Sequence, residues 1–121
     1  MDITRRFVGR TAILDLNGRL TVGPAEVELA PLRTAMYELT RSGCVDIAIN
    51  LARVTQFDAR SLGELVCAST IIQRHGGRFR LVAPPRRVAR MLAITRIDAV
   101  LEVCNSESEL NARAKRFERF Q

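Results

Sequence analysis

Residues 45–65 read Val-Asp-Ile-Ala-Ile-Asn-Leu-Ala-Arg-Val-Thr-Gln-Phe-Asp-Ala-Arg-Ser-Leu-Gly-Glu-Leu, which is a strand signal followed by a helix signal. Apolar and polar residues partly alternate over 45–51, and this predicts a central β-strand. The stretch from Ser61 to His75 has a broad apolar surface and predicts a well-buried helix. Asp58 falls at the junction, where a helix start exposes free backbone N–H groups, so the junction suits the binding or carrying of an anion.

The chain on both sides of this stretch predicts alternating strands and helices. Gly9-Arg10 fits a tight hairpin turn, and Asn17-Gly18 is a second turn signal. Pro31 indicates that the first regular helix begins near Ala30, because proline is tolerated in a first turn. The predicted strands are 3–8, 11–17, 45–51, 78–82 and 100–104; the predicted helices are 27–42, 61–75, one beginning at Pro84-Pro85, and one opened by a capping box from Ser106 to Glu109.

This order, β-β-α-β-α-β-α-β-α, predicts an α/β fold. We expect a mixed, mostly parallel sheet of four to five strands, with a hairpin strand at one edge and about four helices. The 121 residues fit one domain, which we expect to span residues 1–121. No apolar run approaches the ~20 residues of a membrane span, and residues 1–6 lack the pattern of a secretory signal. We therefore expect a cytoplasmic protein without membrane insertion.

Composition argues against two further classes of protein. Cys44, Cys67 and Cys104 are odd in number and far apart, which predicts small buried hydrophobic residues rather than disulfides or metal ligands. The net charge is +6, but the basic residues are spread along the chain. The chain has no tryptophan, and Tyr37 is its one tyrosine, so stacking on single-stranded nucleic acid has few candidates. We expect no nucleic-acid partner.

Residues suited to catalysis are scarce. His75 is the one histidine, and it stands before Gly76-Gly77, where a helix C-terminus favours it. No nucleophile and base stand out as a pair, neither common phosphate-loop motif occurs, and the carboxylates show no metal-ligand spacing. The sequence predicts no enzyme, no cofactor and no metal site.

Two features besides Asp58 bear on binding. Arg86, Arg87 and Arg90 stand at the start of the third predicted helix, where positive charge opposes the helix dipole. They fit either contact with an acidic partner or a solvated helix face. The loop 20–24 is expected at the same sheet edge as Asp58, where ligands of open α/β sheets tend to bind.

From about residue 11 to residue 112 the chain resembles the STAS domain family (sulfate transporter and anti-sigma factor antagonist). The motifs that carry this resemblance are individually weak, but their order and spacing are fairly specific. They are a strand ending in Gly-Arg-Leu (14–20), the strand 47–51, the segment 57–65, a Gly-Gly followed by a strand (75–82), and the helix 88–97.

The resemblance implies a regulatory module. Stand-alone bacterial members antagonise an anti-sigma factor that is also a serine kinase, and this kinase phosphorylates a Ser or Thr directly after the family's Asp. The usual family segment is Asp-Ser-Ser-Gly-Leu-Gly, and here it reads Asp-Ala-Arg-Ser-Leu-Gly over 58–63. The residues that the resemblance places on the partner-binding surface are Asp58, Ala59, Arg60, Ser61, Leu62, Gly63 and Glu64.

Ala59 occupies the phosphoacceptor position and has no hydroxyl group. A phosphate would add about −1.5 to −2 charge to this helix start and so expel a partner. The leading hypothesis is a module that binds the anti-sigma factor kinase without being switched at the usual site. Ser61 is the rival acceptor, with Arg60 able to pair with its phosphate, but it lies about 200° around a regular helix. A small residue packed where the family has glycine is the favoured interpretation of Ser61.

Two other roles stay open at this point. One is a structural STAS subunit of a lipid-transport ABC complex, which also tolerates loss of the phosphoacceptor. The other is a small-ligand sensor, for example of a nucleotide, that uses the edge near Asp58. The sequence is compatible with a homodimer and does not decide the point.

Overall fold

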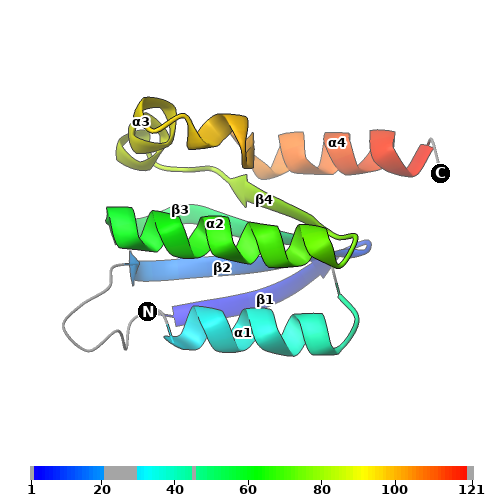
Figure 1. Cartoon of the computed structure of the whole chain (residues 1–121). Coiled ribbons are helices and arrows are strands. Elements are labelled where there is room, and N and C mark those ends of the chain that lie inside the picture. Colours follow the sequence, from blue (N-terminus) through cyan, green and yellow to red (C-terminus); the bar gives the residue numbers. More distant parts are fainter. Residues whose placement is uncertain (1, 21–29, 45, 120–121) are drawn as a thin grey trace.

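A computed structural model describes residues 2–20, 30–44 and 46–119 (Figure 1). The elements follow the predicted order, with one short 3-10 helix added before the last strand. They are β1 (Asp2–Val8), β2 (Thr11–Leu20), α1 (Ala30–Arg41), β3 (Asp46–Phe57), α2 (Ala59–Arg74), β4 (Arg78–Val82), α3 (Arg86–Ile94), η1 (Ile97–Ala99), β5 (Glu102–Cys104) and α4 (Glu107–Arg119).

The five strands form one mixed sheet in the order β1-β2-β3-β4-β5. Only β1 is antiparallel, and it pairs with β2 through a two-residue turn in which Val8 faces Thr11. Gly9 in that turn has a φ of 61°, a conformation that glycine adopts at little cost. The other neighbouring strands are parallel, as crossover helices require. The predicted fold class is confirmed.

Helices cover both faces of the sheet. Leu14, Ile49 and Leu81 belong to the larger core cluster, under α1, α2 and α3. Ile13 and Ala48, one residue out of step, point to the other face and join the cluster beneath Leu110 of α4. Because both faces are covered, β2 and β3 contain nearly continuous apolar runs rather than a strict alternation.

Two central strands are longer than predicted. Asn17-Gly18 does not end β2, because Gly18 is accommodated at a φ of 118° inside an irregular strand with register shifts on both sides. The strand β3 likewise continues past Leu51 to Phe57, with Val54 and Phe57 buried. The extra length carries both strands to the start of α2.

The last strand is shorter than predicted. It begins at Glu102 rather than Val100, because the chain first forms η1. The turn into η1 is made by Arg96, which has a φ of 60°. Val100 is left 62% exposed.

The helix α2 is less buried than its sequence predicts. It buries Leu62, Leu65 and Ile72 against the sheet, while Cys67 and Ile71 face outward. Cys104 is buried and Cys44 half-buried, so the prediction of buried cysteines is wrong for Cys67 alone. None of the helices in the described part of the chain is long and apolar enough to cross a membrane.

Candidate functional site

Asp58 is the N-cap of α2 and has an extended backbone with φ −127° and ψ 175°. Its Oδ1 accepts a hydrogen bond of 2.8 Å from the backbone N–H of Ser61 and lies 2.8 Å from the Ser61 hydroxyl. The sequence suggests this helix start as a place for a bound anion, and the Asp58 carboxylate itself occupies that place. It accepts a hydrogen bond from a backbone N–H group that would otherwise be free, and its negative charge compensates the positive end of the helix dipole.

Ser61 has its side chain inside the protein. The residue is fully buried, and its hydroxyl donates to the backbone carbonyl of Leu20, the last residue of β2. The start of α2 is thus tied both to its own cap and to the end of a neighbouring strand. This placement agrees with the interpretation of Ser61 as a small packed residue.

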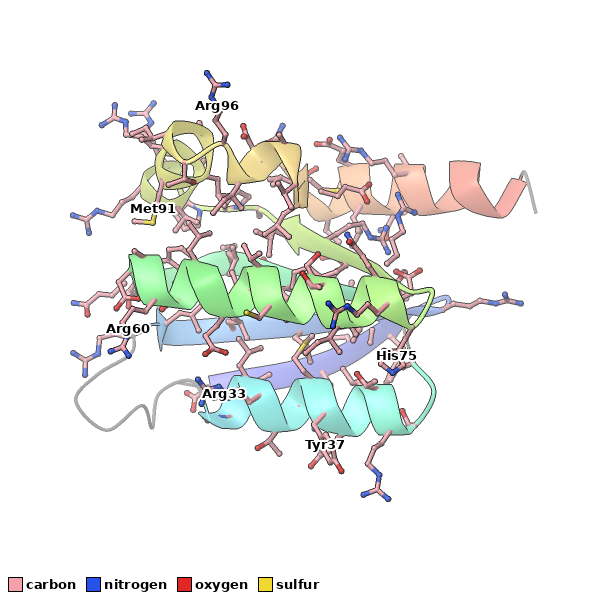
Figure 2. All side chains as sticks on the ribbon, viewed as in Figure 1. Arg33, Tyr37, Arg60, His75, Met91 and Arg96 are labelled. Carbon is pink, nitrogen blue, oxygen red and sulfur yellow. The ribbon has the colours of Figure 1, made fainter. Side chains whose placement is uncertain are left out.

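The other five residues of the predicted surface separate into two groups. Ala59, Arg60 and Gly63 are exposed. Figure 2 shows Arg60 projecting from the start of α2. A side chain at Gly63 would meet open space, since no heavy atom beyond its chain neighbours and its own helix backbone lies within 4 Å of its Cβ position. Leu62 is 3% exposed and packs in the core, and half-buried Glu64 pairs with Arg33 of α1 at 2.5 Å.

Basic residues gather on α3. Val88 and Leu92 anchor this helix in the core, which leaves Arg86, Arg87 and Arg90 exposed. Figure 2 shows Met91 of α3 and Arg60 of α2 at the same end of the molecule. The basic residues of α3 and the exposed start of α2 therefore lie at one end, which we call the basic end.

Sequence reasoning missed two residues, one at the end of α3 and one in the turn that follows it. Arg96 is exposed and holds a left-handed backbone conformation that favours glycine. Ile94 is an apolar residue that is 75% exposed. No turn motif in the sequence points to Arg96, and Ile94 lies outside the row of Val88 and Leu92 through which α3 faces the core. Of the predicted binding loop 20–24, Leu20 ends β2 and residues 21–24 lie outside the described residues.

A polar network lies on the face of the sheet that carries α4. Arg6 of β1 binds Asp15 of β2 through Nε at 2.5 Å and Glu107 of α4 through Nη1 at 2.7 Å. Asn50 of β3 donates to the same Asp15 at 2.7 Å. The hydrogen bonds from Arg6 hold the pKa of Asp15 and that of Glu107 below their ordinary values. The network joins four elements, and we interpret it as structural.

Metal-binding side chains do not cluster in the described part of the chain. The described residues contain no cluster of three or more His, Cys, Asp or Glu side chains that could hold a metal. His75 has its Nδ1 2.8 Å from the carbonyl oxygen of Ile71, as expected for a residue that closes a helix. The arrangement at the basic end can bind another surface by charge and shape.

Comparison with known proteins bears on this geometry. A family model described as "Mlab, STAS domain" matches residues 3–102. The chain belongs to this STAS family. Two relatives, from Thermotoga neapolitana and Thermotoga maritima, carry the name "putative anti-sigma factor antagonist" and are 35% and 32% identical over 72 and 79 residues. The matches cover 60% and 65% of this STAS chain. They cover 64% of the Thermotoga neapolitana relative and 70% of the Thermotoga maritima relative, so the chain spans less than two thirds of the first relative's length.

Solved structures agree on the fold. A crystal structure from Thermotoga maritima, described as a "putative anti-sigma factor antagonist", is 25% identical with a TM-score of 0.77, and the match covers 93% of this STAS chain and 94% of that one. SpoIIAA of Bacillus, solved in its phosphorylated form, is 16% identical with a TM-score of 0.69 over 92% and 98% of the two chains. The chain is thus similar to proteins of the anti-sigma factor antagonist class, which is generally regulatory.

Proposed function

We propose that this STAS protein is a cytoplasmic, non-enzymatic antagonist that binds an anti-sigma factor kinase through its basic end and is not switched by phosphorylation. The observation that carries the proposal is Ala59. It is exposed at the first position of α2, where a hydroxyl group would be accessible to a kinase, and it has none.

The rival acceptor supports the same proposal. The hydroxyl of Ser61 is buried and donates to the Leu20 carbonyl, so a kinase would have to unfold the start of α2 to reach it. A phosphate there would also stand beside the carboxylate of Asp58, 2.8 Å from the present hydroxyl, and would repel it. The serine therefore serves the packing of the junction.

Charge indicates the kind of surface that docks at the basic end. Neither α2 nor α3 has an acidic residue in its first turn, and α3 begins with exposed Arg86 and Arg87. Positive charge at a helix start is unfavourable by a few tenths of a kcal/mol or more, which an acidic partner would offset. We infer that the kinase presents carboxylates to Arg86, Arg87 and Arg90.

The test is phosphorylation by the anti-sigma factor kinases of the parent organism, with ATP, followed by mass-spectrometric mapping of residues 55–65. The wild type should stay unmodified, and Ala59→Ser should acquire one phosphate at residue 59. A complex with one of these kinases in size-exclusion chromatography is also expected. Phosphate on wild-type Ser61, or a lack of any complex, would contradict the proposal.

A second function is favoured by one observation, because the matching family model bears the description "Mlab, STAS domain". In this alternative the chain is a structural STAS subunit that braces the ATPase of a lipid-transport ABC complex. Co-purification at native expression level separates the two roles. An ABC ATPase bound to the chain would support the structural role, and a histidine-kinase-fold protein would support the antagonist.

A further inference from the structure

A groove separates α1 from α2 on the side that faces away from the sheet. It has a volume of about 340 Å³, and Leu32 and Ile72 form part of its floor. Its walls are mostly apolar. On α1 they include Met36 and Tyr37, which is 62% exposed, and on α2 they include exposed Cys67 and Ile71, which is 50% exposed. Figure 2 shows Tyr37 projecting outward from α1.

The wall residues recur at helical spacing. On α1 the groove is lined at positions 33, 36, 37 and 40, and on α2 at positions 64, 67, 68 and 71. The two helices run side by side in the same direction (Figure 1), so these rows form two ridges. Each row spans about 10 Å, or roughly two helical turns. A groove of this form suits a further amphipathic helix that inserts apolar anchors at i, i+3 or i+4, and i+7.

The two ends of the groove differ in charge. The end near the start of α2 is closed by the Arg33–Glu64 ion pair, which is neutral. At the other end, Arg41 lies 5.8 Å from the centre of the Tyr37 ring, and α2 finishes with exposed Arg74. The C-termini of two helices offset about one positive charge, so the open end keeps a net positive charge.

The charge at the open end indicates which kind of molecule binds in the groove. A second copy of the chain carries a formal net charge of +6, so association of two copies works against charge repulsion. We propose that the α1–α2 groove docks an amphipathic helix of another protein, with apolar anchors toward Met36 and Ile71 and a carboxylate toward Arg41 and Arg74. This surface is separate from Ala59, and the inference does not depend on the proposed function.

The test uses three synthetic 14-residue helical peptides as probes. The first peptide has leucines at i, i+3, i+7 and i+10, which form its apolar face, and glutamates at the remaining positions of its first and last turns. The second has lysines in place of the glutamates, and the third has serines in place of the leucines. Binding is followed by backbone amide shifts in ¹H–¹⁵N spectra of the full chain. We expect saturable shifts confined to α1 and α2 for the first peptide, and at least tenfold weaker binding of the other two.

A matched pair of variants locates the site. Ile71→Asp places a carboxylate in the groove and should weaken binding of the acidic peptide at least tenfold. Ile94→Asp changes an isoleucine that does not line the groove and should leave the affinity for this peptide within twofold of the wild type. Dispersed spectra verify that both variants fold. Shifts outside the groove, equal binding of the acidic and lysine peptides, or equal effects of the two variants would overturn the proposal. So would groove shifts that depend on protein concentration without peptide, because they would assign the groove to a second copy.

Discussion

Asp58 fixes the shape of the surface on which Ala59 is displayed. Its carboxylate satisfies the Ser61 N–H, and the Ser61 hydroxyl holds the helix start against Leu20. The carboxylate is therefore needed for local structure, whatever it contributes to a partner.

Asp58→Ala should lower the free energy of unfolding by about 1 kcal/mol, because the N-cap is lost. Asp58→Asn should keep most of that stability, since an amide oxygen also accepts the Ser61 N–H. Urea denaturation measures both variants. If Asp58→Ala is as stable as the wild type, the cap is not what holds this junction.

Arg96 is a residue in a backbone conformation that its side chain does not favour. Its φ of 60° places it among the positive-φ residues that cost ~1 kcal/mol or more when they are not glycine. Arg96→Gly should therefore raise the free energy of unfolding by about 0.5–1 kcal/mol, while Arg96→Ala, which keeps the strain, should change it little. Thermal and urea denaturation of the two variants give the comparison, and equal stabilities would show that the turn into η1 is not strained.

At the scale of elements, Arg6 connects the edge strand β1 to the central strand β2 and to α4. It is held by Asp15 and Glu107, whose pKa values are lowered by its hydrogen bonds from the ordinary 3.8 and 4.5. Groups with a lowered folded-state pKa stabilise the fold above their unfolded-state pKa, and this contribution disappears as the pH falls through the folded-state value.

Arg6→Met should consequently lower the free energy of unfolding by about 1 kcal/mol at pH 7, a modest value because the pairs are partly solvated. The difference from the wild type should shrink as the pH falls from 7 to below the ordinary pKa values of the two carboxyl groups, through their lowered folded-state values. The matched control is Arg5→Met, which removes a more exposed pair with Glu38 and should cost less. Urea denaturation across this pH range measures the effect, and a difference independent of pH would contradict the role of the two carboxylates.

The sequence predicts the order and type of the elements well, because apolar periodicity and capping residues are local signals. Ser106, for example, accepts from the N–H of Glu109 at 3.1 Å, as its capping box predicts, while the Glu109 carboxylate accepts from Asn105 at 2.9 Å. Strand ends are predicted less well. Gly18 can end a strand or bend one, and only pairing with β3 decides between them.

Side-chain partners distant in sequence could not be predicted at all. Arg80 appears in the sequence as an ordinary strand residue, yet it is fully buried and pairs with Asp46, 34 residues away. Glu107 lies 101 residues from Arg6. At the candidate site, the sequence favours Ser61 as a small packed residue, but its bond to the Leu20 carbonyl depends on how β2 and α2 meet in space.

At the scale of the whole molecule, the chain offers two surfaces of different chemistry. The basic end carries Ala59 and the arginines of α3, and the α1–α2 groove is apolar, with Arg41 and Arg74 near the C-terminal ends of its two helices. Both proposals assign an acidic partner to their surface, which agrees with the net charge of +6. An increase in ionic strength should therefore weaken binding at either surface, and most strongly at the basic end.

The central claim is that the basic end binds its kinase without a covalent switch. The most direct measurement is the dissociation constant of the complex by isothermal titration calorimetry, before and after incubation with kinase and ATP. For the wild type we predict the same constant within twofold, and for Ala59→Ser at least a tenfold loss of affinity after ATP. A wild-type complex that weakens tenfold after incubation with ATP would contradict the account.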